Sequence, residues 1–179
     1  GFGSHTVAAI TTAYRVDAIM LLPIINLGSA ISTMVAQSKG AGEPQRARHF
    51  WRTGAVVNLV VSLLLMAVML LFGGKLVALF GVEAEAAAIG RRFFQRISLF
   101  YVFFGLACSM RGTIEGTGRV VYSSAVSIAA LLLRIALSYL LAGAFLNMAI
   151  AYAEGLHWIF MVLCFLPFFL RRDRWAQNS

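Results

Sequence analysis

Five long apolar blocks dominate this sequence and limit how the chain can fold. They cover approximately residues 6–37, 54–80, 93–110, 120–144 and 147–170. A helix rises about 1.5 Å per residue, so about 20 apolar residues cross the roughly 30 Å hydrocarbon core of a bilayer. Because that core holds no water to satisfy exposed backbone groups, such segments cross it as helices. We therefore predict an all-α, polytopic membrane protein with five transmembrane helices.

The composition agrees with this class. Hydrophobic residues make up 60% of the chain and charged residues only 12%, against about 25% charged residues in a soluble domain. No nucleophile–base arrangement, metal-ligand spacing or cofactor-binding loop is recognisable, so we expect neither an enzyme nor a bound cofactor. Cys108 and Cys164 lie within apolar blocks, where we predict small core residues rather than a disulfide. Because the chain begins with Gly1 and lacks an initiator methionine, we expect a piece of a longer protein.

The net charge of +8 could suggest a nucleic acid partner, but the positions of the charges indicate a membrane topology instead. If the blocks alternate in direction, one end of the helices receives nine basic residues, Lys39, Arg46, Arg48, Arg52, Arg111, Arg119, Arg171, Arg172 and Arg174. The other end receives Lys75, Arg91, Arg92 and Arg96, together with Glu83 and Glu85. Basic residues concentrate on the cytoplasmic side of a membrane. We therefore predict that residue 1 lies outside and the C-terminus lies in the cytoplasm, with the lipid bilayer of the inner or plasma membrane as the partner.

A few polar side chains interrupt the apolar blocks and are the candidate functional residues. An ionised group at the bilayer centre costs about 2.5–3.5 kcal/mol on insertion scales, so such groups face other helices or a wet cavity. The candidates for a transport site or a buried polar site are Asp17, Asn26, Arg96, Arg134 and Glu154. For Asp17 we weigh a transport role against a structural tie to Arg96 or to the surroundings of Arg15.

Arg134 and Glu154 are predicted to approach each other. Arg134 lies about ten residues from the outer end of its block and Glu154 about seven from the outer end of the next, so their depths are similar across a short hairpin. The pair could hold the register of two helices, or it could be a site that handles a proton or a substrate. The sequence leaves both roles open.

Glycine and proline residues suggest where the helices bend, end or touch. Pro23 predicts a kink in the first block, and the small residues from Gly28 to Ser32 offer a surface for close helix contact. Gly73 and Gly74 predict the end of the second membrane-spanning helix, followed by a short interfacial helix over residues 76–80. Apart from Asn58 and Ser62, that second helix is predicted to be a scaffold that faces lipid. Three glycines predict a cytoplasmic link over residues 111–119.

Several short motifs, in their order and at their helix ends, resemble the C-terminal half of multidrug and toxic compound extrusion (MATE) transporters. They are Arg15-Val16-Asp17, Leu22-Pro23, Leu27-Gly28-Ser29-Ala30, Val35-Ala36-Gln37, Gly40-Ala41-Gly42, Arg46-Ala47-Arg48, Met110-Arg111-Gly112, Gly116-Thr117-Gly118 and Arg134-Ile135. The resemblance implies a transporter of twelve helices in two bundles that exports amphipathic or cationic compounds in exchange for Na⁺ or H⁺. Residues 1–179 would be helices eight to twelve, most of one six-helix bundle, with the N-terminal half of the transporter absent.

The resemblance places no coupling-ion site on a residue of this chain. Coupling carboxylates of the family lie on helices one, seven or ten, and block 93–110, the equivalent of helix ten, contains no acidic residue. The site for Na⁺ or H⁺ is therefore expected outside this sequence. Two alternatives stay open. A lipid-linked oligosaccharide flippase of related fold would use a cationic cavity containing Arg15, Arg96 and Arg134, and a truncated membrane module would transport nothing.

Overall fold

The computed structural model describes residues 4–79, 84–145 and 148–170. They form α1 (Ser4–Gly40), α2 (Pro44–Ala78), α3 (Ala84–Ile97), the 3-10 turn η1 (Ser98–Phe100), α4 (Tyr101–Gly116), α5 (Val120–Phe145) and α6 (Ala149–Leu170). Five segments are long and apolar enough to cross a membrane, namely Ile10–Gly40, Pro44–Ala78, Ala87–Gly116, Val120–Gly143 and Ala149–Leu170. Within these described ranges no strand is present. The predicted all-α, polytopic membrane fold is confirmed.

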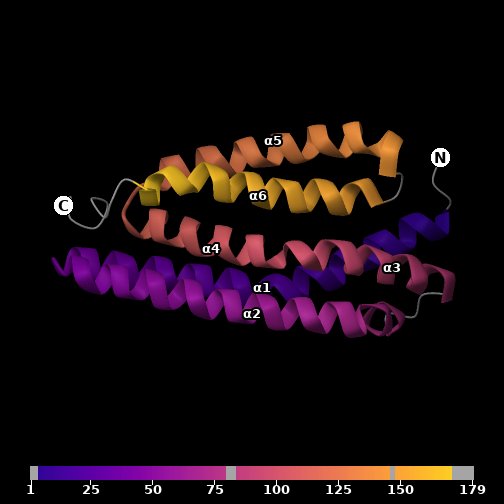
Figure 1. Ribbon diagram of the computed structural model, residues 1–179, viewed down its shortest axis with the longest axis horizontal. Coiled ribbons are helices and arrows are strands. Elements are labelled where there is room, and N and C mark those ends of the chain that lie inside the picture. Colours follow the sequence, from indigo (N-terminus) through magenta and orange to yellow (C-terminus); the bar gives the residue numbers. More distant parts are fainter. Residues whose placement is uncertain (1–3, 80–83, 146–147, 171–179) are drawn as a thin grey trace.

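The helices run side by side along the long axis of the molecule (Figure 1). In that view α5 and α6 lie on one side of α4, and α2 lies on the other with most of α1. α1 packs mainly against α4 and α2, whereas α5 packs mainly against α6. The α5–α6 hairpin therefore joins the rest of the bundle chiefly through the contact of α6 with α4.

The chain crosses the bundle in alternating directions, as the charge count assumed. α1 ends, α2 begins, α4 ends and α5 begins at the left of Figure 1, whereas α2 ends, α3 begins, α5 ends and α6 begins at the right. Lys39, Arg46, Arg48, Arg52, Arg111 and Arg119 thus belong to one end, and Lys75, Arg91, Arg92 and Arg96 to the other. Glu83, Arg171, Arg172 and Arg174 and the side chain of Glu85 lie outside the described residues.

Glycines bring α1 and α4 into close contact. A Cβ atom added to Gly112 would collide with the carbonyl oxygen of Gly28, and one added to Gly116 would lie 2.5 Å from the carbonyl oxygen of Ser32. The predicted close-contact surface from Gly28 to Ser32 is therefore confirmed. The predicted link over residues 111–119 is corrected, because α4 continues to Gly116 and its glycines face the α1 backbone. The chain then turns at Gly118, whose φ of 87° favours glycine.

The second membrane-spanning helix also differs from its prediction. α2 begins at Pro44, because proline suits the first turn of a helix, and runs through Gly73 and Gly74 to Ala78. These glycines do not end the helix. A Cβ atom on Gly73 would lie 3.0 Å from Phe94, and one on Gly74 would lie 3.2 Å from Arg91, so both glycines make room for α3. The predicted interfacial helix over 76–80 is therefore wrong for residues 76–78, and Phe80 lies outside the described residues.

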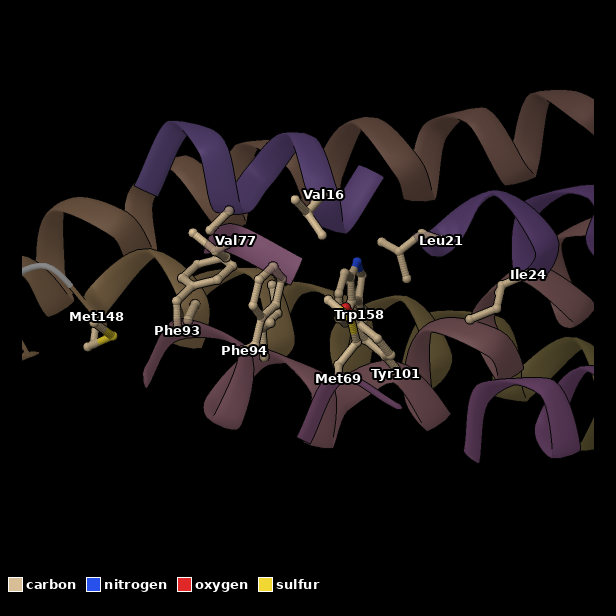
Figure 2. Packing of buried hydrophobic residues seen from close by; sticks show 13 residues of the cluster. Val16, Leu21, Ile24, Met69, Val77, Phe93, Phe94, Tyr101, Met148 and Trp158 are labelled. Atoms are coloured by element: carbon tan, nitrogen blue, oxygen red, sulfur yellow. The ribbon is translucent and has the colours of Figure 1, made fainter. Parts of the chain in front are cut away.

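The predicted third block begins within α3, which continues through η1 into α4. The aromatic residues of this region form a packed core with α1, α2 and α6, in which Phe93, Phe94, Tyr101 and Trp158 are fully buried (Figure 2). Large aromatic side chains supply much of the burial that holds such a core together. α1 is helical through Pro23, and the size of any kink there stays a prediction.

Candidate functional site

A buried carboxyl group marks the contact between α1 and α4. Asp17 is only 4% exposed, because α1 turns Ala13, Val16 and Asp17 toward the interior of the bundle. Tyr101 begins α4 immediately after η1 and is fully buried. The Tyr101 hydroxyl donates a hydrogen bond to Oδ1 of Asp17. The structure thus confirms that Asp17 points into protein and gives it a neutral partner.

The predicted tie between Asp17 and an arginine is not found. The guanidinium of Arg96 lies over the ring of Tyr152, 5.8 Å from its centroid, and Arg15 lies on the exposed side of α1. Within the described residues, Asp17 makes no ion pair. Arg96 cannot reach Asp17 because α3 is rotated so that Arg96 points toward Tyr152 of α6 and not toward α1.

Arg134 and Glu154 form the predicted contact across the α5–α6 hairpin. Nε of Arg134 lies 2.8 Å from Oε2 of Glu154, and the two side chains are 33% and 11% exposed. Oε2 accepts no well-aligned hydrogen bond, so we describe the contact as an ion pair and not as a bidentate hydrogen-bonded pair. The contact predicted from the similar depths of the two residues is therefore confirmed.

The neighbours of Glu154 hold it in the interior. A Cβ atom on Gly155 would collide with the ring of Phe100, so only glycine lets α6 lie this closely against η1. On the next turn of α6, Nδ1 of His157 lies 3.8 Å from Oε1 of Glu154 and 3.2 Å from its main-chain oxygen. Trp158 packs beside Tyr101 at a ring distance of 6.2 Å (Figure 2). Glu154 and Tyr101 are thus anchored to one aromatic core.

Asp17 and Glu154 lie on different helices and border the same aromatic core. Asp17 accepts a hydrogen bond from Tyr101, whose ring packs beside Trp158, and Trp158 lies one turn after Glu154 on α6. The Tyr14 ring packs against Phe93, and its buried hydroxyl makes no well-aligned hydrogen bond. We call Tyr14, Asp17, Tyr101, Arg134 and Glu154 the buried polar cluster. Across residues 4–79, 84–145 and 148–170, no three His, Cys, Asp or Glu side chains are placed to hold a metal ion.

Asn58 is a buried polar residue that the sequence did not place in a site. It is fully buried where α1, α2 and α4 meet, and its side-chain nitrogen approaches three acceptors. These are the Ser109 hydroxyl at 3.0 Å, the Gly105 carbonyl at 3.1 Å and the Ile24 carbonyl at 3.4 Å. α2 otherwise exposes Val56, Leu64 and Leu71, as predicted for a helix that faces lipid. The sequence signal that could have identified this site is the single amide side chain, Asn58, within the apolar stretch of α2.

Asn26 does not join the buried polar cluster. It lies on the exposed side of α1, in line with Ser29, Thr33 and Gln37 at the three- and four-residue spacings that share one helix face. Two of these hydroxyls donate to their own helix, Ser29 to Ile25 and Thr33 to Ser29. We call Asn26, Ser29, Thr33 and Gln37 the polar face of α1.

Comparison with known proteins decides the family. The MatE family model matches residues 1–140. This chain belongs to the MatE family. Among its relatives is the "Probable multidrug resistance protein YoeA" of Bacillus subtilis, 29% identical over 73% of this chain and 28% of the relative. "Protein DETOXIFICATION 14" of Arabidopsis thaliana is 34% identical over 59% of this chain and 22% of the relative.

The structural comparison agrees about the fold. A solved structure titled "Crystal structure of MATE in complex with MaD3S" matches all of this chain with a TM-score of 0.84 at 19% identity, and the match covers 41% of that protein. The MatE chain described here therefore spans less than a third of YoeA and DETOXIFICATION 14 and less than half of the solved structure. The two relatives carry the names of a multidrug resistance protein and a detoxification protein, which agrees with the prediction that the chain is not an enzyme.

Proposed function

We propose that this chain forms most of the C-terminal bundle of a secondary transporter that exports drugs and other amphipathic organic cations in exchange for H⁺ or Na⁺. Membership in the MatE family, with relatives named for multidrug resistance, is the observation that carries the proposal. A transporter of this kind holds its substrate between two bundles and opens alternately to either side of the membrane. The second bundle would be supplied by the N-terminal half of the same protein.

The polar face of α1 indicates where the substrate path would run. Asn26, Ser29, Thr33 and Gln37 are exposed in this bundle, and polar groups within a membrane face protein or water in preference to lipid. We infer that this face lines the space between the two bundles. Apolar side chains around it, such as Ile19 and Leu22, would contact the hydrophobic parts of an amphipathic cation.

The distribution of basic residues supports an orientation. We infer that the end carrying Lys39, Arg46 and Arg119 faces the cytoplasm of a plasma or inner membrane, because basic residues are retained on that side. The N-terminal end of α1 and the α5–α6 turn would then face outward. The buried polar cluster would lie in the outer half of the bundle.

The alternatives receive less support. A flippase would need several uncompensated cations in one cavity, but Arg134 is paired with Glu154 and Arg96 lies over Tyr152. A truncated, non-transporting module would still bury its polar groups. No observation favours it over a transporter bundle.

The test is export by the full-length transporter reconstituted in proteoliposomes. We expect a fluorescent organic cation such as ethidium to move against its gradient when an inward-directed H⁺ or Na⁺ gradient is imposed. Vesicles without protein and vesicles without a gradient are the controls. Ethidium movement that no ion gradient changes would contradict coupled export.

A further inference from the structure

We propose that Asp17 carries an exchangeable proton and is a coupling carboxyl group located within this chain. The proposal rests on the proposed function above, because the proton would be exchanged for the exported cation. It assigns the ion to a residue on α1 that packs against α4, whereas the sequence led us to expect the coupling site outside this chain. The support comes from the charges and contacts of the buried polar cluster.

The charges in the cluster do not balance unless one group binds a cation. Asp17 and Glu154 are both acidic, and Arg134 is the basic side chain among the five residues of the cluster. Arg134 is 2.8 Å from Glu154, so it compensates that carboxylate. Asp17 has the hydroxyl of Tyr101 as its partner, which is a neutral donor. An ionised carboxylate buried without a cation is so costly that it takes up a proton instead.

The groups around Asp17 on the neighbouring helices are consistent with a proton. Tyr14 on α1 and Tyr101 on α4 offer neutral hydroxyls, Arg134 on α5 is engaged by Glu154, and His157 on α6 lies beside Glu154. α2 and α3 contribute the apolar side chains Met69, Phe93 and Phe94 to the same core. Among the described residues, no three His, Cys, Asp or Glu side chains are placed to hold a metal ion together. A proton needs only the Asp17 carboxyl group.

Release of the proton would leave the buried polar cluster with a net negative charge. The O–H bond of the Asp17 carboxyl group breaks, the proton passes to a water molecule, and the bonding electron pair stays on the carboxylate. The cluster then holds two carboxylates and one guanidinium, and that guanidinium is paired with Glu154. This state is stabilised only where water reaches the cluster, so proton loss would favour a conformation in which the cluster is hydrated. The buried arrangement described here fits the protonated state.

Infrared spectroscopy of the full-length transporter in lipid tests whether Asp17 holds a proton. We expect a carbonyl stretching band of a protonated carboxyl group near neutral pH in the wild type, and loss of that band in Asp17→Asn. Glu115→Gln is the matched control, because Glu115 lies near the other end of α4, paired with Arg111 at 2.7 Å. A band that is absent from the wild type, or that persists unchanged in Asp17→Asn, would overturn the proposal.

A second variant keeps the proposal testable if Asp17→Asn does not fold. Tyr101→Phe removes the hydrogen bond to Asp17 while keeping the carboxyl group, so the same band should shift to higher frequency. Tyr139→Phe is its control, because Tyr139 is 81% exposed, and it should leave the band in place. A band that does not move in Tyr101→Phe would assign the proton to another residue.

Exchange of the proton is tested by adding ethidium to weakly buffered, detergent-solubilised transporter and recording the pH. We expect the wild type to release protons as ethidium binds, and Asp17→Asn to bind ethidium with a smaller release. Equal release from both proteins would overturn the role of Asp17, and so would a release that added Na⁺ reproduces without ethidium. If ethidium neither binds nor is exported, the proposed function fails, and the infrared band alone decides whether Asp17 is protonated.

Discussion

The hydroxyl of Tyr101 donates a hydrogen bond to Oδ1 of Asp17, and this contact joins the start of α4 to α1 inside the bundle. The two residues are 84 positions apart in the chain and both are buried. Arg134 and Glu154 form a second polar contact, between α5 and α6. The first contact joins α1 to α4 and the second joins α5 to α6, and both border the aromatic core that contains Tyr101 and Trp158.

Tyr101→Phe should destabilise the full-length transporter. The substitution leaves a buried carboxyl oxygen without its donor, which costs about 1–3 kcal/mol. The measurement is the thermal unfolding midpoint in detergent, with Tyr139→Phe as the exposed control. An unchanged midpoint in Tyr101→Phe would show that the hydrogen bond contributes nothing to stability.

Removing both partners of the Arg134–Glu154 pair should cost less than the sum of the single changes. Arg134→Met leaves Glu154 without its cation, and Glu154→Gln leaves Arg134 without its anion. Contacting residues show interaction energies of about 0.5–3 kcal/mol in double-mutant cycles. Unfolding free energies of the two single variants and the double variant give this value. Strictly additive effects would mean that the two groups do not interact.

Gly112→Ala should strongly reduce the stability of the α1–α4 contact. The added methyl group would meet the carbonyl oxygen of Gly28, which is backbone and cannot rotate away. Overpacking of this kind costs about 1–3 kcal/mol, and more where backbone must move. Gly143→Ala is the control, because nothing lies within 4 Å of its added Cβ atom. Folded yield and the unfolding midpoint are the measurements, and equal results for both variants would contradict the close contact.

Asn58→Leu should lower stability, whereas Asn26→Leu should lower transport. Asn58 joins three helices, and hydrogen bonds between membrane helices contribute about 0.6 kcal/mol on average, so its loss should lower the unfolding midpoint. Asn26 is exposed on the polar face of α1, so its loss should reduce ethidium export while the midpoint stays unchanged. If Asn26→Leu exports normally, the substrate path does not follow this face.

The sequence predicted those features that depend on spacing along one or two adjacent helices. The five spans follow from apolar length, and the Arg134–Glu154 contact follows from similar depths in one hairpin. The close-contact surface from Gly28 to Ser32 was also predictable, because small residues within a membrane helix favour approach by another helix. In each case the necessary geometry is local.

Features that depend on the rotation of distant helices were missed. The partner of Asp17 is Tyr101 and not Arg96, because η1 and the turn of α3 against α6 decide which side chain meets α1. The sequence predicts a helix end at Gly73 and a link that contains Gly112, but both glycines lie within helices. A glycine that ends a helix and one that admits a neighbouring helix look alike until that neighbour is known.

The decisive measurement is ethidium export from proteoliposomes containing the full-length transporter, with a pH gradient imposed and the membrane potential held at zero. We predict that the wild type exports faster with the gradient and that Asp17→Glu keeps part of this response. Asp17→Asn should bind ethidium but lose the response. Export by Asp17→Asn that follows the pH gradient as closely as the wild type would contradict a coupling role for this carboxyl group.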